Sequence, residues 1–147
     1  MPGYLDQYGA GEERRIKIIK TVAISLVSLM ILGGILWFVF HNYREEQRVK
    51  QFYALLDARD YKSAYAMFGC TEAKPCPGYS FEKFMQDWGP ASGHTNLANA
   101  RITRSRSCGS GVILTVDLGQ DKRETLWVER KNMNVGFPPF EGCPAGM

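Results

Sequence analysis

The sequence has little of what most catalytic sites are built from. Only two of its 147 residues are histidines, only four are cysteines, and no Gly-x-Ser-x-Gly, phosphate-loop or dinucleotide-binding motif occurs. The cysteines lack the Cys-x2-4-Cys spacing of zinc sites and redox dithiols. A net charge of +3 without a compact basic tract argues against nucleic acid as a partner. We therefore expect no enzyme activity, no cofactor and no metal.

Charge is absent from the run formed by residues 21–40. At ~1.5 Å per residue, a helix over this run spans roughly 30 Å, the thickness of a bilayer core. No small-residue cleavage site follows it, so we expect an uncleaved anchor rather than a signal peptide. The expected organisation is a short flexible cytoplasmic tail (1–20), a transmembrane helix (21–43) and an extracytoplasmic domain (44–147). The bilayer is then one partner of the chain.

The orientation follows from the residues that flank the run. Four basic residues precede it (Arg14, Arg15, Lys17 and Lys20) and three follow it (Arg44, Arg48 and Lys50). The positive-inside rule favours a cytoplasmic N-terminus on this count. All four cysteines lie after the run, which fits an oxidising compartment. We expect a single-pass protein of the inner (plasma) membrane with its C-terminal domain outside the cytoplasm.

Three helices are predicted after the anchor. Apolar side chains recur at helical spacing over residues 45–58, 61–68 and 81–88. Asp60 and Ser80 stand where the second and third of these helices need an N-cap.

Strand periodicity then replaces helical periodicity. Residues 112–118 and 124–130 alternate between apolar and polar side chains, residues 100–107 form a further candidate strand, and Met133, Val135 and Phe137 form the last one. Helices followed by antiparallel strands define an α+β fold, with the three helices packed on a β-meander.

A family resemblance can be named on three segments. These are VKQFYALLDARDYKSAYAMF, SFEKFMQDW and ETLWVERKNMNVGF. Together they resemble small bacterial domains of the nuclear transport factor two-like superfamily, whose Asp-Tyr-x-x-Ala-Tyr turn is matched by Asp60, Tyr61, Ala64 and Tyr65. The tryptophan that members commonly carry in the last strand stands one strand earlier here, as Trp127. The superfamily includes isomerases, dehydratases, binding modules and assembly subunits, so the fold does not choose a function.

The resemblance implies where an active site would lie. In the enzymes of the superfamily, Asp, His or Tyr points into a cone between sheet and helices, and the candidates here are Tyr53, Tyr65 and Asp117. Asp117 alternates out of phase with the apolar residues of its strand, so we expect it to face solvent. Both tyrosines lie on apolar helix faces, where packing in the core is the expected role.

The two histidines offer little more. His41 lies at the expected membrane edge. His94 lies in a loop near Asp87 and Ser92, and the three can be written as a hydrolytic trio, but adjacency in sequence does not supply the required hydrogen-bond chain.

The cysteines are expected to form two disulfides. Cys70 and Cys76 flank a proline-containing loop, whereas Cys108 lies at a turn and Cys143 lies in a tail that has no other obvious tether. Three pairings are possible, and locality favours Cys70 with Cys76 and Cys108 with Cys143.

Arginine is concentrated in one predicted strand. Arg101, Arg104 and Arg106 lie within six residues, and Arg104 and Arg106 share a strand face, while Arg123, Arg130 and Lys131 lie on later strands. These residues form either a solvated face or a docking patch for an acidic partner or lipid headgroups, which basic side chains near the bilayer attract.

These observations favour binding over catalysis. We expect a non-catalytic accessory or assembly subunit of a larger membrane protein complex, with Arg101, Arg104 and Arg106 contacting the partner. The alternative is a small-ligand or weakly enzymatic pocket in the cone. An apolar cone lined by Tyr65, Trp88 and Trp127, with one buried acid, would favour that alternative, and a cone filled by its own side chains would favour docking.

Overall fold

The computed structural model describes residues 6–94, 97–140 and 142–143, with side chains from residue 12 onward. The chain divides into two compact units, Met1–His41 and Asn42–Met147. We describe each unit by itself.

The first unit contains one long helix, α1 (Asp6–Phe40). It begins well before the apolar run, so the segment 6–20 is helical rather than flexible as the glycines predicted. The reason is the composition beyond Gly11, where Glu, Arg and Lys are good helix formers and outweigh the isolated glycines. The most apolar window of the helix has a mean hydropathy of 2.5, and its described side chains are exposed, so α1 is long and apolar enough to cross a membrane.

The second unit, which we call the domain, opens with helices. They are α2 (Tyr43–Asp57), α3 (Tyr61–Ala66), α4 (Phe81–Trp88) and a short 3-10 helix, η1 (Leu97–Asn99). The Asp60 side chain accepts a hydrogen bond from the Ser63 N–H at 3.1 Å, and Ser80 accepts one from the Lys83 N–H at 3.3 Å. Both N-caps therefore satisfy a backbone donor that the first turn leaves free. The 3-10 helix was not anticipated from the sequence.

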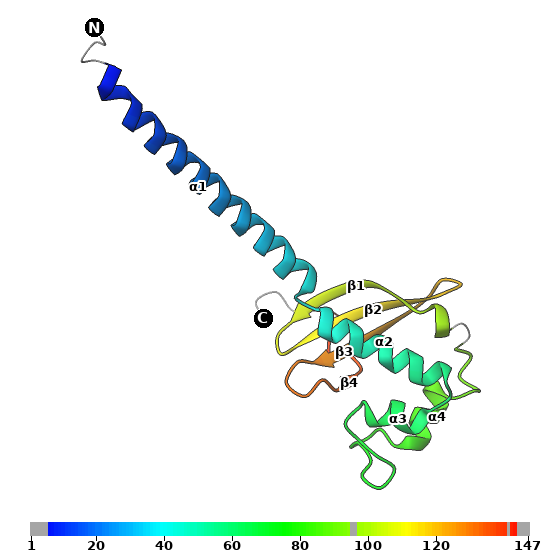
Figure 1. Cartoon of the computed structure of the whole chain (residues 1–147). Coiled ribbons are helices and arrows are strands. Elements are labelled where there is room, and N and C mark those ends of the chain that lie inside the picture. Colours follow the sequence, from blue (N-terminus) through cyan, green and yellow to red (C-terminus); the bar gives the residue numbers. More distant parts are fainter. Residues whose placement is uncertain (1–5, 95–96, 141, 144–147) are drawn as a thin grey trace. The chain divides into compact units, whose positions relative to one another are not determined.

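A four-stranded antiparallel sheet follows. Its strands are β1 (Arg101–Cys108), β2 (Gly111–Gly119), β3 (Lys122–Glu129) and β4 (Val135–Gly136), in the order β1-β2-β3-β4 (Figure 1). The register between β1 and β2 shifts once, between Ile102 and Arg104, which leaves Thr103 as a bulge. The α+β class predicted from the sequence is confirmed.

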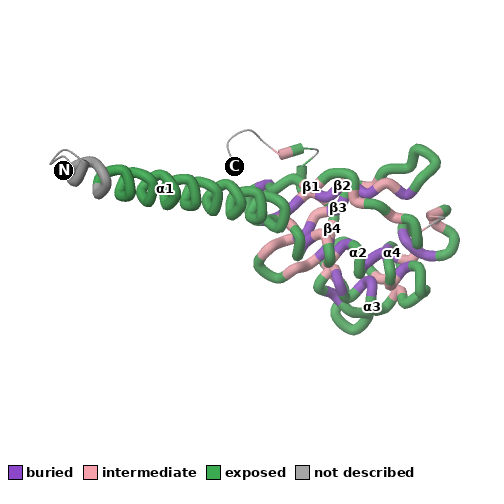
Figure 2. The backbone as a smooth tube through the Cα atoms, turned by 45° about the horizontal axis from the view of Figure 1, so that its top comes forward, coloured by how far each residue is buried: buried purple, intermediate pink, exposed green. Residues whose placement is uncertain are grey.

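The core lies between the helices and one face of the sheet. Val112, Leu114, Val116 and Leu118 are buried and alternate with more exposed residues along β2. The largest fully buried side chains that the structure describes are Tyr65, Phe52, Phe84, Leu56, Leu114 and Leu126. Figure 2 shows the buried segments of the domain gathered where helices and strands meet. The interior is therefore packed with aromatic and aliphatic side chains of the chain itself.

The opposite face of the sheet carries a different set of side chains. Antiparallel pairing places cross-strand partners on the same face, so the residues that alternate with the core positions of β1, β2 and β3 share one surface. We call this surface the outer face; it is formed by Arg101, Arg104, Arg106, Cys108, Gly111, Ile113, Thr115, Asp117, Arg123, Thr125, Trp127 and Glu129.

Candidate functional site

The outer face is organised in four cross-strand rows, and the row at the end of β1 is Cys108–Gly111–Glu129. Arg101 pairs with Asp117, which pairs with Arg123, so this row holds a carboxylate between two arginines. The two neighbouring rows are Arg104–Thr115–Thr125 and Arg106–Ile113–Trp127, and neither contains an acidic residue.

Arg104 and Arg106 are thus the arginines whose rows contain no carboxylate. Both side chains are exposed, and they share one face of β1 as the sequence predicted. Among the described residues, no salt bridge involves either of them. Glu129, one row beyond Arg106, accepts the Ser110 hydroxyl hydrogen at 2.9 Å, and both arginines present their positive charge to solvent.

An aromatic area adjoins the Arg106 row. The Trp127 ring packs over Gly111, where a β-carbon would come 2.6 Å from Cε2 of the indole. A cavity of about 520 Å³ lies beside it, lined by Cys108, Gly109, Ser110, Trp127, Glu129, Phe137, Pro139 and Phe140. Phe140 is 43% exposed, whereas the Phe137 ring packs against Phe68 and Tyr79, with centroids 5.9 and 5.3 Å apart. Arginine next to tryptophan and phenylalanine is the composition that protein interfaces favour.

Two disulfides restrain the domain, in the pairing that locality predicts. Cys70 and Cys76 have their Cα atoms 5.3 Å apart and close the loop between α3 and α4. Cys108 and Cys143 have theirs 5.5 Å apart, and this bond fastens the tail to the end of β1, beside the aromatic area.

Arg130 does not belong to the basic patch that the sequence suggested. Its Nη2 donates to Asn42 Oδ1 at 2.9 Å and to Ser107 Oγ at 2.8 Å, while its Nε donates to Glu45 Oε1 at 3.3 Å. Glu45 is only 6% exposed. Because a buried carboxylate needs a charged partner, the role of Arg130 is to tie the first residues of the domain to β1.

The histidine loop makes an unforeseen contact with β3. His94 Nδ1 lies 2.9 Å from Ser92 Oγ and its Nε2 lies 3.3 Å from Glu124 Oε1, and the ring stacks on Trp88 with centroids 4.9 Å apart. The trio proposed from sequence contained Asp87 instead, but Asp87 accepts the Tyr79 hydroxyl hydrogen at 2.9 Å. Glu124 could have been suspected, because it is a carboxylate at a core-facing position of its strand.

The geometry of this cluster favours a structural role. The Ser92 hydroxyl donates to the Gly89 carbonyl at 2.6 Å, so its proton is directed at the backbone rather than at the imidazole. A nucleophilic serine needs the opposite arrangement, with its hydroxyl donating to the base. The cluster closes the loop after α4 onto the sheet.

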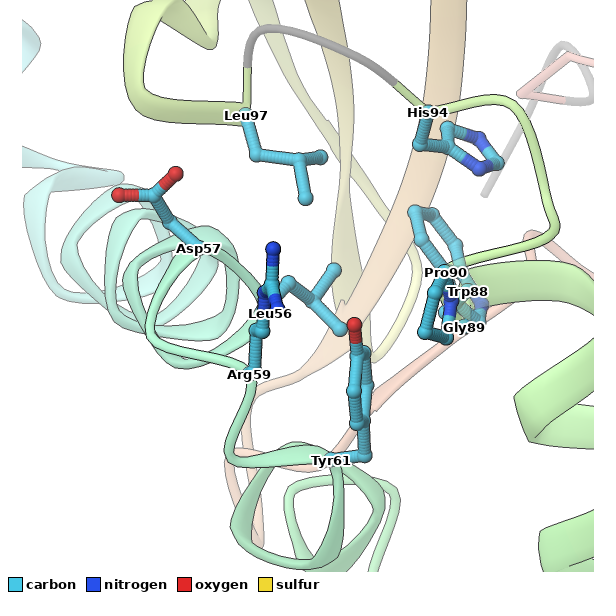
Figure 3. A pocket seen from close by; sticks show the side chains of 9 residues that line it. All are labelled: Leu56, Asp57, Arg59, Tyr61, Trp88, Gly89, Pro90, His94 and Leu97. Atoms are coloured by element: carbon cyan, nitrogen blue, oxygen red, sulfur yellow. The ribbon is translucent and has the colours of Figure 1, made fainter.

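Two cavities adjoin this loop. One, of about 250 Å³, is drawn in Figure 3, where Leu97 and Tyr61 point into it from opposite sides and the Asp57 carboxylate points away. The second, of about 390 Å³, is lined by Gln86, Asp87, Trp88, Ser92, His94, Glu124 and Phe137. Asp57, Arg59 and Pro90 are exposed residues, so the first cavity opens at the surface of the domain.

The remaining catalytic candidates are occupied structurally or face outward. The Tyr65 hydroxyl donates to the Tyr79 carbonyl at 2.7 Å and accepts from the Cys76 N–H at 3.1 Å. Asp117 lies on the outer face, as predicted, and its Oδ1 accepts the Gly119 N–H at 2.8 Å. Tyr53 is buried, and burial, with a smaller contribution from the Glu124 charge, raises its pKa above the ordinary tyrosine value.

Neither a metal cluster nor a relative supplies a function. Across the described ranges, no group of three or more His, Cys, Asp or Glu side chains lies together. No family model, no curated protein and no solved structure matches the chain. The functional assignment therefore rests on the geometry of the outer face and of the histidine loop.

Proposed function

We propose that the chain is a single-pass membrane protein whose extracytoplasmic domain docks to a partner, as a non-catalytic accessory or assembly subunit of a larger membrane protein complex. The observation that carries this proposal is the outer face, where the exposed Arg104 and Arg106 have no carboxylate in their rows and Trp127 lies beside them. Three helices cover the core face of the meander in this proposal, which leaves the outer face for the partner.

The anchor and the disulfides support the orientation. With a cytoplasmic N-terminus, both disulfides lie on the oxidising side, where such bonds persist. The helix α1 ends at Phe40, and α2, the first helix of the domain, begins at Tyr43. A reporter fused after Met147 is expected to behave as extracytoplasmic, and strong activity of a cytoplasm-only reporter there would overturn the orientation.

We also propose that the domain belongs to the nuclear transport factor two-like superfamily. The support is the turn between α2 and α3, where Asp60 caps the second helix of the expected pattern, followed by the antiparallel meander.

The alternative function is a small-ligand pocket in the cone. The His94–Glu124 contact beside a cavity of about 390 Å³ favours it. Against it, Tyr65, Phe52 and Phe84 fill the interior at 0% exposure, and Trp127 lies on the outer face instead of lining the cone. The side chains of Tyr65, Phe52 and Phe84 occupy the space between the helices and the sheet that a small ligand would need.

Charge reversal distinguishes the two functions. The full-length Arg104→Glu/Arg106→Glu variant should lose the partner that wild-type protein retains in detergent extracts, as measured by affinity purification and mass spectrometry. A Lys50→Glu/Lys74→Glu variant, which changes the net charge equally on residues outside the outer face, is the matched control. Both variants should melt near wild type, because exposed substitutions cost little stability. Docking through this face is wrong if the arginine variant keeps the partner while a folded His94→Ala variant abolishes the cellular phenotype.

A further inference from the structure

The first strand of the sheet has an open side. It stands at the end of the order β1-β2-β3-β4, and no strand in the described parts of the chain pairs with its second side. Arg101, Thr103, Arg104, Arg106 and Ser107 are exposed along it. An edge of this kind offers backbone donors and acceptors to another polypeptide.

The turn after β1 determines which backbone groups face outward. Cys108 pairs with Gly111 across a two-residue turn, so the Cys108 carbonyl is directed at β2. The pairing continues without a shift from Cys108 back to Arg104. Because the direction of backbone groups alternates along a strand, Ser105 and Ser107 direct their N–H and C=O groups to the open side.

The contacts of Ser107 agree with this assignment. Its carbonyl oxygen lies 3.9 Å from Cys143 Sγ, a group that belongs to the tail rather than to β2. The disulfide-held tail thus borders the open side at one end, and the bulge at Thr103 borders it at the other. The segment between them contains Arg104, Ser105 and Arg106.

The positive charge of Arg104 and Arg106 limits which kind of strand can pair with the open edge of β1. If a second copy of β1 paired antiparallel about Ser105, Arg104 of each strand would stand opposite Arg106 of the other, and like charges placed opposite one another are destabilising. A bulge and basic side chains are also the devices that keep edge strands from pairing indiscriminately. A strand with acidic side chains on the same face escapes this penalty and gains two opposite-charge pairs.

We propose that the open edge of β1 receives an extended acidic segment of a partner polypeptide, which adds to the sheet as a further strand. Its backbone pairs with Ser105 and with the N–H of Ser107, and its acidic side chains lie beside Arg104 and Arg106 on the outer face. The proposal rests on the docking function above and specifies the partner's recognised element. Main-chain hydrogen bonds between the two strands provide the affinity, and the two arginines provide specificity for an acidic segment.

Ser105 allows the backbone contribution to be tested apart from charge. A proline there removes an N–H that faces the open side and leaves the ladder to β2 intact, which is the position at which sheets tolerate proline. Ser105→Ala is the matched control, since the Ser105 hydroxyl is buried and has no hydrogen-bond partner among the described residues. Thermal melts of both variants establish that each is folded.

The experiment uses the full chain in detergent micelles and a synthetic peptide in which glutamate alternates with threonine. The wild-type protein and Ser105→Ala should bind this peptide, with amide hydrogen exchange slowed at Ser105 and Ser107. Ser105→Pro and Arg104→Glu/Arg106→Glu should each bind about tenfold more weakly or worse, the effect of losing one or two such interactions. A peptide in which lysine replaces glutamate should not bind.

Each other outcome overturns the proposal. If wild-type protein neither binds the glutamate peptide nor gains protection at Ser105, no strand is added. If Ser105→Pro binds as Ser105→Ala does, the arginines act by charge alone. Neither result bears on the docking function, which is tested separately by whether the arginine variant retains the native partner during purification.

Discussion

The indole ring of Trp127 lies over the backbone of Gly111, close enough that a β-carbon there would come 2.6 Å from Cε2 of the ring. The absence of a side chain at position 111 lets the ring lie against the sheet. Trp127 stands in the same cross-strand row as Arg106, so this contact fixes the aromatic area next to the exposed arginines. The composition of the outer face depends on that glycine.

Gly111→Ala should therefore displace the indole ring and destabilise the domain. Forcing a methyl group into packed side chains costs about 1–3 kcal/mol. Gly136→Ala is the control, because a β-carbon at that strand position meets nothing within 4 Å. Thermal melts and tryptophan fluorescence of both variants measure the difference. Equal melting temperatures and unchanged spectra would show that Trp127 does not depend on position 111.

Removing the hydroxyl group should lower the stability of the domain at one buried tyrosine but not at another. Tyr65→Phe leaves the Cys76 N–H and the Tyr79 carbonyl without their partner, which should cost about 1–3 kcal/mol. Tyr53→Phe should be neutral or stabilising, because the Tyr53 hydroxyl has no hydrogen-bond partner within the described ranges. Denaturant unfolding of the two variants gives the comparison, and a larger loss in Tyr53→Phe would refute this account of the core.

Alkaline pH should destabilise the domain through the same core. Burial raises the pKa of Tyr53 and of Tyr79 above the ordinary value of 10.0, and the Asp87 hydrogen bond adds to the shift at Tyr79. Below pH 10 the stabilising contribution is complete; above it, the unfolded chain releases protons that the folded chain keeps, so stability falls as pH rises. Melting temperatures between about pH 9 and 11 should fall less for Tyr53→Phe than for wild type. An identical pH dependence in the two proteins would contradict the assignment.

The two disulfides should contribute unequally to stability. Cys108 and Cys143 are separated by 35 positions and Cys70 and Cys76 by 6, so the first bond removes more chain entropy from the unfolded state. Replacing the first pair by serine should cost roughly 3–4 kcal/mol and replacing the second roughly 2 kcal/mol. Non-reducing peptide mapping checks the pairing itself, and a crossed pairing or four free thiols would refute it.

Local sequence signals predicted most of the fold and little of the histidine loop. The N-caps Asp60 and Ser80 and the alternation along β2 depend on neighbours within a few positions, so they could be recognised without the structure. The contact of Arg130 with Asn42 joins residues 88 positions apart, and that of His94 with Glu124 joins residues 30 apart. Such pairs are set by how the layers pack, and no periodicity in the sequence records them.

For the outer face too, local sequence signals predicted some features, whereas others depended on the pairing of strands. Strand phase was sufficient to place Arg104 and Arg106 on one face. The register with β2 and β3 was needed to learn that Asp117 shares a row with Arg101 and that the rows of Arg104 and Arg106 contain no carboxylate. The bulge at Thr103 shifts that register by one residue, and the alternation of apolar and polar residues along β1 does not predict it.

Site-specific photocrosslinking in intact cells tests docking through the outer face most directly. A photoreactive amino acid at Thr125, an exposed position in the Arg104 row, should give one defined adduct with a membrane protein partner. The same amino acid at Lys50, an exposed position on α2, should give none. Adducts of equal yield from both positions, or from Lys50 alone, would contradict the claim that the domain binds its partner through the outer face of the sheet.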